Sequence, residues 1–299
     1  MMLSKNIKTA LIVLLATAFS SAYAYDFKAG DVYYDILSET GGTCEVSHGT
    51  ERYEGNIVIP SAVTYNGKQY TVTGIGDFAF SWCTDLTGVS IPQGVKSIGS
   101  SAFSWCFSLS DITLPESLSS IGDHAFSGCS GISTLTIPEA VTTIENYAFY
   151  GCSQLDSISL PASLSAINGY AFSGCRGIKS IVIHEDVSFI GTNAFNGCSS
   201  ISEVTCLATL PPTISSENAL GTVEQRKAST LYVNYGTKDL YAKAYGWKDF
   251  GTIIEINVPD AISSVVTGLK TPTRKVLSSG SIIIIKGNKQ HDVSGRTIQ

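Results

Sequence analysis

Charged side chains are scarce in this sequence, and histidine and tryptophan are scarcer still. Of 299 residues only 15% are charged, four are histidine and three are tryptophan. Acidic residues outnumber basic ones by 25 to 19, so the chain lacks the strong basic character of nucleic-acid-binding proteins. It also has no Cys-x-x-Cys pair and no cluster of histidines, which are the usual ligands of zinc. We therefore expect no nucleic-acid partner, no metal site and no cofactor.

Long apolar runs are absent after the N-terminus, and the one run near it is too short to cross a membrane as a helix. Lys5 and Lys8 precede an apolar stretch, and small residues lead up to Ala24. This order is typical of a secretory signal peptide. We expect residues 1–24 to be removed on export, which leaves a mature chain that begins at Tyr25 and has no membrane span.

Hydrolase motifs are missing as well. Neither Gly-x-Ser-x-Gly nor His-Glu-x-x-His occurs in the sequence. The neighbouring acids Glu185 and Asp186 have the chemistry of glycosidase carboxylates, but adjacent acids in a turn more often form a solvated surface. His124 and His184 fall at surface positions of the repeat described next. We predict no catalytic residues and no enzymatic activity.

One internal repeat of 23 residues organises most of the chain. Its unit reads Ile-Gly-x-x-Ala-Phe-x-x-Cys-x-x-Leu-x-x-Ile-x-Ile-Pro-x-x-Val-x-x. Six copies keep the same register, with isoleucine at Ile75, Ile98, Ile121, Ile144, Ile167 and Ile190, phenylalanine at Phe80, Phe103, Phe126, Phe149, Phe172 and Phe195, and cysteine at Cys83, Cys106, Cys129, Cys152, Cys175 and Cys198.

The two halves of the unit have different hydrophobic periods. Alanine, phenylalanine, cysteine and leucine are spaced i, i+1, i+4 and i+7, which predicts a short helix or helical turn. The apolar pairs that follow, such as Ile112 with Leu114, alternate with polar residues as a strand with one buried face does. Proline then ends the strand in four of the repeats, at Pro92, Pro115, Pro138 and Pro161.

A single unit cannot bury its apolar side chains, but stacked units can, because their strands pair about 4.8 Å apart in a continuous sheet. Burial contributes roughly 1.5–3 kcal/mol for each large aliphatic or aromatic side chain. We therefore predict an α/β repeat fold, a leucine-rich-repeat solenoid. A parallel sheet lies on one face, short helices or helical turns lie on the other, and both ends are capped.

The repeated Ile-Gly-x-x-Ala-Phe-x-x-Cys resembles the unit of the BspA-like leucine-rich-repeat family of bacterial surface proteins, over about residues 50 to 255. The resemblance implies an exported protein of the cell surface or the extracellular space, and the expected location is a gram-negative envelope. It also implies adhesion to host matrix proteins, host cell surfaces or other bacteria. In this frame, residues 25–74 are an N-terminal cap with a hairpin, residues 75–212 hold six repeats, and residues 213–258 are a C-terminal cap.

The last segment, residues 259–299, differs from the rest in charge, with six basic residues against two acids. A strand is expected over Ile282 to Ile285. The segment is similar to the terminal sorting tails of exported proteins from gram-negative gut and oral bacteria. A plain flexible extension is the alternative.

Eight cysteines in an exported chain would usually indicate disulfides. Here six of them form one apolar ladder, and Cys206 takes an inward position of a strand. Identical side chains stacked in parallel rarely meet the dihedral angle of a disulfide. We expect reduced thiols that pack in the core.

Binding is expected at the positions that vary between repeats. The residues that point outward from the predicted sheet include Ser90, Thr113, Thr136 and Ser159, with Asp111 beside them. Repeat proteins use such extended surfaces to bind partners. The alternative is that these are ordinary soluble strand residues. The six repeats carry three basic and 11 acidic residues, which favours basic or neutral protein partners.

Aromatic residues offer a second candidate surface. Trp82 and Trp105 occupy equivalent positions in consecutive repeats, where later repeats have glycine, and Tyr147 and Tyr170 lie on the same side of the unit. Exposed aromatic rings mark contact sites. The two tryptophans either stack at the surface or pack beneath the hairpin around Asn66.

Three functions fit the sequence. The first is a non-enzymatic protein that mediates protein–protein interaction or adhesion. The second is a carbohydrate-binding surface component, in which Trp82 and Trp105 stack on the rings of a glycan. The third is a structural spacer of the envelope with no ligand of its own.

Overall fold

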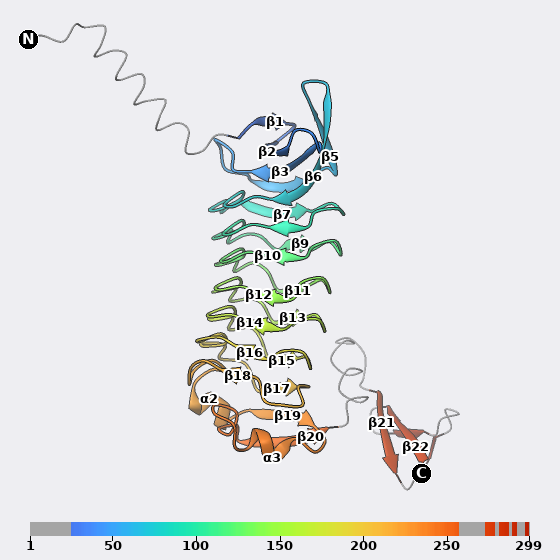
Figure 1. The fold of residues 1–299 in the computed structure, drawn as a ribbon. Coiled ribbons are helices and arrows are strands. Elements are labelled where there is room, and N and C mark those ends of the chain that lie inside the picture. The colour runs from blue at the N-terminus through green and yellow to red at the C-terminus, as the bar shows by residue number, and fades with distance from the viewer. Residues whose placement is uncertain (1–24, 257–272, 279–280, 287–288, 292–296, 299) are drawn as a thin grey trace, which may run out of the picture.

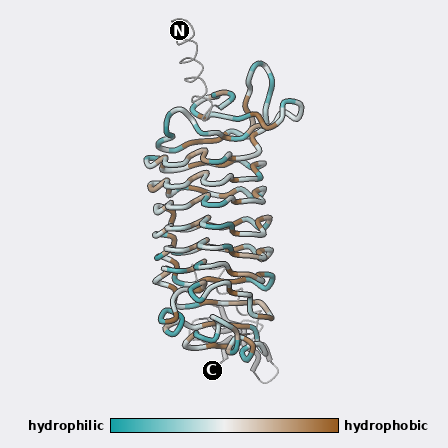
Figure 2. The backbone as a smooth tube through the Cα atoms, turned by 60° about the vertical axis from the view of Figure 1, so that its left-hand side comes forward, coloured by the Kyte–Doolittle hydropathy of each residue, from teal (hydrophilic) through white to brown (hydrophobic). Residues whose placement is uncertain are grey.

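The computed structural model describes residues 25–256, 273–278, 281–286, 289–291 and 297–298. The predicted signal peptide, residues 1–24, lies outside them. Residues 25–256 wind into a solenoid whose coils stack along one axis (Figure 1). Each coil mixes hydrophobic and hydrophilic residues (Figure 2). The buried hydrophobic side chains of all coils form one core. No helix in the described part of the chain has the length and apolar character needed to cross a membrane.

One side of the solenoid is a ladder of parallel strands, here called the long ladder. It runs in three hydrogen-bonded groups, which are interrupted between β9 and β11 and between β13 and β15. The strands are β4 (Gly55–Val58), β7 (Leu86–Ser90), β9 (Asp111–Thr113), β11 (Thr134–Thr136), β13 (Ser157–Ser159), β15 (Ser180–Ile183), β17 (Glu203–Cys206), β19 (Thr230–Asn234) and β20 (Thr252–Ile256). The predicted parallel sheet is therefore present.

A second side of each coil carries a shorter parallel ladder, here called the short ladder, which the sequence reasoning missed. Most of its strands have only two residues, too few to show a period of two. They are the end of β6 (Lys68–Ile75), then β8 (Ser97–Ile98), β10 (Ser120–Ile121), β12 (Thr143–Ile144), β14 (Ala166–Ile167), β16 (Phe189–Ile190) and β18 (Thr213–Ile214).

The third side of each coil, the turn side, contains successive turns and no helix in the six repeats. The residues at positions 78 and 82 have left-handed backbone angles, with φ of 58° at Phe78 and 61° at Trp82. These angles end an α-helix after a single turn. The amide of Phe80 instead donates to the carbonyl of Ala102 in the next repeat, at 2.7 Å. Of the predicted alternatives, the helical turn describes this segment better than the helix.

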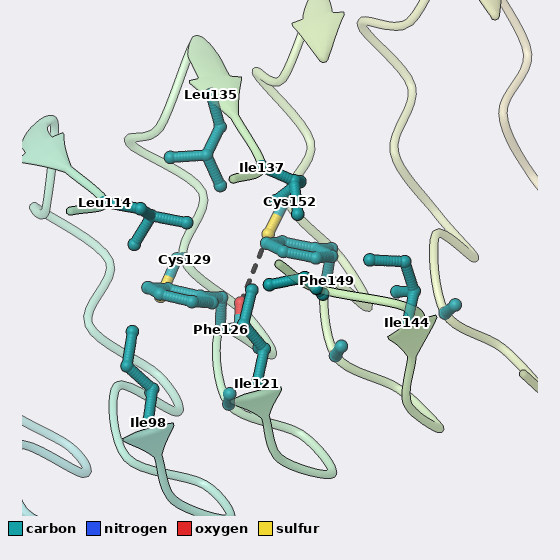
Figure 3. Close-up of a cluster of buried hydrophobic side chains, with 14 of the residues drawn as sticks. Ile98, Leu114, Ile121, Phe126, Cys129, Leu135, Ile137, Ile144, Phe149 and Cys152 are labelled. Carbon is teal, nitrogen blue, oxygen red and sulfur yellow. Dashed lines mark hydrogen bonds between the residues drawn. The ribbon is translucent and has the colours of Figure 1, made fainter. Parts of the chain in front are cut away.

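The repeated apolar residues fill the space between the three sides (Figure 3). The rings of Phe103 and Phe126 are stacked with centroids 5.1 Å apart, and both side chains are fully buried. From the second repeat on, the thiol of each repeat donates to a carbonyl in the preceding repeat: Cys129 Sγ lies 3.0 Å from Phe103 O, and Cys152 Sγ lies 3.1 Å from Phe126 O. The register of the repeat is thus set by packing and by inter-repeat hydrogen bonds together.

The N-terminal end is covered by an antiparallel meander of β1 (Phe27–Ala29), β2 (Val32–Ser38) and β3 (Thr43–Ser47). β3 pairs in parallel with β6, so the meander continues the short ladder. β5 (Ala62–Tyr65) and β6 form a hairpin that projects beyond the end of the solenoid (Figure 1). Asn66 and Gly67 make its tight turn, both with positive φ, as the Asn-Gly signal predicts.

The C-terminal end is closed by α2 (Val223–Lys227), α3 (Lys238–Tyr241) and strands β19 and β20. Trp247 is fully buried and donates from Nε1 to Pro212 O at 2.9 Å, and Phe250 is also buried. Arg226 is buried in this cap, where its guanidinium donates to Glu217 O at 2.7 Å and pairs with Asp249 at 3.2 Å. These contacts cover the last open coil.

Four strands follow in the tail: β21 (Thr273–Ser278), β22 (Ser281–Lys286), β23 (Lys289–His291) and β24 (Thr297–Ile298). They pair antiparallel in chain order. The strand expected over residues 282–285 falls within β22. A sorting role for residues 259–299 stays a prediction.

Candidate functional site

The outward side chains of the long ladder form a line of small polar residues. Ser90 pairs in register with Thr113, and Thr136 pairs in register with Ser159. All four are exposed, while the residues that alternate with them point into the core. In the part of the chain that the structure describes, none of the four hydroxyls bonds another protein group. We call Ser90, Thr113, Thr136 and Ser159 the outer stripe.

The surface is hollowed along this stripe. A hollow of about 400 Å³ is lined by Thr113, Thr136 and Ser159. A second, of about 230 Å³, is lined by Ser90, Asp111 and Thr113. Both include Thr113 and Leu114, so they join into one groove that crosses β7, β9, β11 and β13. The structure thus brings together all five predicted residues of the sheet surface.

Carboxylates give the groove its charge. Asp111 and Glu116 line it, and both are exposed. Further along the ladder Glu203 lies in register beside Ser180, at the outward position that Asp111 holds in its own repeat. No lysine or arginine lines either hollow. The groove therefore presents hydroxyl and carboxylate oxygens, a chemistry that suits neutral or basic ligands.

The predicted tryptophan pair lies on the turn side, away from the groove. Trp82 and Trp105 stack with centroids 5.4 Å apart and planes inclined by 25°, and Phe107 contacts both rings. Trp82 is 49% exposed. The stacking is confirmed, and the alternative that both rings pack beneath the hairpin is wrong.

Tyr147 and Tyr170 belong to a second stack on the same side. Tyr147 lies between His124, at 4.5 Å, and Tyr170, at 4.7 Å, with nearly parallel planes. Tyr150 meets Tyr147 edge-on. Neither tyrosine lines the groove. The site residues predicted from the sequence therefore fall on two separate surfaces.

Both stacks run along the solenoid axis, so each ring covers the face of its neighbour. Trp105 has Trp82 on one face and the backbone of Gly128 on the other, because a Cβ atom at Gly128 would lie 2.4 Å from the Trp105 ring. Tyr147 is likewise covered on both faces. Such stacks expose ring edges, whereas a sugar ring stacks on an open ring face.

The cysteine sulfurs are buried and cannot reach a substrate. All eight cysteines are free and buried, which is the state expected from their ladder spacing. Burial raises the pKa of Cys106 to about 12 and the pKa of Cys206 to about 11. A nucleophilic cysteine requires the opposite shift and an accessible sulfur.

Among the described residues, no three His, Cys, Asp or Glu side chains lie close enough together to hold a metal ion. Glu185 and Asp186 are both exposed, as a solvated turn requires.

Sequence reasoning missed the first members of the groove surface. Val58 lies in register with Ser90, and Asn56 lies in register with Gly88. Both belong to the half-repeat that ends at Pro60, whose Ile57 and Ile59 are buried. The sequence contained the signal for this strand, because Ile57 and Ile59 are separated by one residue, as Val89 and Ile91 are in the next coil.

Comparison with known proteins places the repeat in a family. Residues 73–202 match, in six copies, the family model described as BspA type leucine-rich repeat region. No curated protein matches the chain significantly.

Two solved structures show the same fold. A leucine-rich cell surface protein from Faecalibacterium prausnitzii A2-165 is 24% identical, with a TM-score of 0.54, over 82% of this chain and 81% of that chain. A leucine-rich repeat protein from T. pallidum is 28% identical, also with a TM-score of 0.54, over 60% of this chain and 80% of that chain. The six repeats of residues 73–202 therefore belong to the BspA-type leucine-rich repeats.

Proposed function

We propose that this chain is an exported, non-enzymatic surface protein that binds another protein through the groove across the long ladder. One observation carries the proposal: four exposed hydroxyl residues from successive coils line a continuous groove, and their hydroxyls bond no other group among the described residues. Solenoids bind partners on surfaces of this kind, to which every coil contributes one or two side chains. The N-terminal pattern of residues 1–24 supports export.

The partner we propose is an extracellular protein of neutral or basic surface, such as a host matrix or cell-surface protein or a protein of another bacterium. Asp111 and Glu116 repel acidic ligands from the groove, and no basic side chain lines it to compensate. Like-charge contacts lower both affinity and the rate of association. Adhesion is the biological role that follows if the partner is fixed to a surface.

A binding experiment with two matched variants tests this proposal. Matrix and serum proteins are passed over the immobilised chain, and over a groove variant that carries Thr113→Lys, Thr136→Lys and Ser159→Lys. The control variant carries Ser120→Lys, Thr143→Lys and Ala166→Lys, which changes the outward positions of β10, β12 and β14 on the short ladder. Both variants add the same charge to three consecutive coils.

We expect saturable binding of at least one protein to the unchanged chain and to the control variant, and its loss in the groove variant. Equal binding by all three chains would place the partner surface elsewhere. No saturable binding of any protein would overturn the protein-binding function and leave a spacer role.

A glycan is the second candidate ligand, and the exposed ring of Trp82 is the observation in its favour. Trp105 covers one face of this ring, so a sugar could stack only on the opposite face. A glycan array separates the two functions. Binding to a sugar that disappears in Trp82→Ala and persists in the groove variant would support the glycan in place of the protein.

A further inference from the structure

β4 closes the long ladder at its N-terminal end, and within the described residues no strand pairs with its outer edge. β4 pairs only with β7, in parallel. The strands of the meander do not pair with this edge, since β3 pairs with β6 and so extends the short ladder instead. The edge of a sheet presents a row of main-chain N–H and C=O groups to which another strand can bond.

The direction of the main-chain groups in β4 follows from two hydrogen bonds. Gly55 N donates to Asp85 O at 2.9 Å, and Ile59 N donates to Ser90 O at 3.0 Å, both toward the β7 side. Successive amides of a strand alternate between its two edges, so those of Asn56 and Val58 face the open edge. Within the described residues, neither of these two amides donates a hydrogen bond to the protein.

A cleft of about 510 Å³ adjoins this edge. It lies between β4 and the turn that joins β1 to β2. Val32, Ile57 and Val58 give it an apolar lining, and Asp31 is the one charged residue among its walls. Val58 is 67% exposed, although valine is usually buried. Free main-chain donors and an open apolar cleft thus occur side by side.

The cleft continues the groove of the proposed function. Asn56 lines both the cleft and the adjoining hollow that contains Ser90 and Thr113. Val58 stands in register with Ser90, so it extends the outer stripe by one coil. A partner in the groove would therefore reach the open edge of β4 without leaving the surface.

We propose that β4 is a strand acceptor: an extended polypeptide segment of the protein partner pairs with its open edge and places an apolar side chain in the cleft. This inference rests on the proposed function and narrows its partner to a protein with an exposed extended segment. Main-chain pairing supplies the affinity in such complexes, and the pocket for alternate side chains supplies the specificity. Asp31 favours a neutral or basic segment.

An extended segment fits this end better than the terminal strand of a second copy. The hairpin of β5 and β6 projects beyond the N-terminal end of the solenoid (Figure 1). A whole second solenoid would meet this hairpin before its own terminal strand could reach β4. A single extended segment has no such obstacle.

The test removes one main-chain donor and leaves the fold in place. In Val58→Pro the amide that faces the open edge is lost, while the bonds of β4 to β7 are kept, because proline is tolerated at outward positions of edge strands. Val58→Thr is the matched control, since it changes the same side chain and retains the amide. The probe is a displayed library of unstructured peptides of about ten residues, long enough to span one strand.

We expect peptides selected on the unchanged chain to bind Val58→Thr with similar affinity and Val58→Pro roughly tenfold more weakly or worse. Hydrogen exchange on the unchanged chain provides an independent readout that needs no variant. The amides of Asn56 and Val58 should gain protection when a selected peptide binds. The unfolding midpoint of each variant shows whether it is folded.

Failure to select any peptide would overturn strand addition. Equal affinity of the selected peptides for the unchanged chain, Val58→Thr and Val58→Pro would overturn it as well. So would self-association of the chain that Val58→Pro abolishes, because the occupant would then be a second copy. Peptides that lose affinity only for the groove variant with three lysines would leave the proposed function standing and refute the strand acceptor. The two proposals therefore fail in different ways.

Discussion

The turn side and the long-ladder side of one coil use their polar groups in opposite ways. On the turn side, alternate amides bond the next repeat, thiols bond carbonyls of the preceding repeat, and aromatic rings cover one another. Along the outer stripe the backbone holds the ladder together, and within the described residues the four hydroxyls make no hydrogen bond to the protein. The same 23-residue unit thus separates a structural side from a surface available for ligands.

This difference follows from where each side chain points. The buried residues that recur in every repeat, such as Phe126 and Cys129, are here called the core ladder. Each of them meets its own copies in the coils above and below, so its size and shape are fixed by the stack. An outward strand residue touches the equivalent residues of neighbouring coils only with the sides of its side chain, and the tip of its side chain faces water. Changes of residue type there alter the ligand surface and leave the stack intact, which is how one scaffold accommodates different partners.

The largest expected effect comes from breaking the core ladder in its middle. Phe126→Ala removes a fully buried ring that stacks on Phe103 and Phe149. We expect the free energy of unfolding to fall by about 3–5 kcal/mol. Thr136→Ala, an outward change in the same repeat, should alter it by less than about 0.5 kcal/mol. Urea denaturation followed by circular dichroism measures both, and similar losses would contradict the division between the two sides.

Much of this division was visible in the sequence. The register of isoleucine, phenylalanine and cysteine predicts the stacked coils, and the alternation around Thr113 and Thr136 predicts which residues line the groove. These predictions succeed because a repeat multiplies a weak local signal six times. A single copy of such a unit would be ambiguous between helix and strand.

The turn side shows where sequence reasoning ends. The spacing of alanine, phenylalanine and cysteine fits a helical face, but left-handed residues at Trp82 and Trp105 and bonds to the next coil replace the helix. The glycines at the equivalent positions of later repeats, such as Gly128, carried the signal for positive φ. The open edge of β4 depends on how the cap meets the first coil, a long-range contact that no local pattern encodes.

A smaller and more local effect tests the stack on the turn side. Gly128 and Gly151 occupy equivalent positions with φ of 76° and 72°, but only Gly128 supports the ring of Trp105. Alanine should cost about 1–2 kcal/mol at either position because of the left-handed angle. At Gly128 we expect roughly 1–3 kcal/mol more, since the new methyl group must displace the ring.

Denaturation curves of Gly128→Ala and Gly151→Ala measure this difference directly. Tryptophan fluorescence adds a second readout, because a displaced Trp105 ring changes its contact with Trp82. We expect an altered emission spectrum for Gly128→Ala alone. Equal stabilities and unchanged spectra in both variants would show that the aromatic stack does not depend on the glycine.

The smallest expected effect is the contribution of one buried thiol, that of Cys106, to the pH dependence of the free energy of unfolding. Burial raises the pKa of Cys106 from an ordinary value of 9.0 to about 12, so the folded state keeps this proton in a range where the unfolded chain loses it. The resulting stability is fully present below pH 9 and is lost as the pH rises toward 12. Between pH 8 and pH 10 this one group should cost about 1.4 kcal/mol.

Cys106→Ala separates this contribution from that of the other titrating groups. The variant is less stable than the unchanged chain at pH 8, because it lacks the packing of the thiol and its hydrogen bond to Phe80 O, but its stability should decline less between pH 8 and pH 10. Denaturation at both values compares the slopes, so the constant loss cancels. Equal slopes would mean that the thiol reaches water in the folded solenoid, and the core ladder would then be open where the structure has it closed.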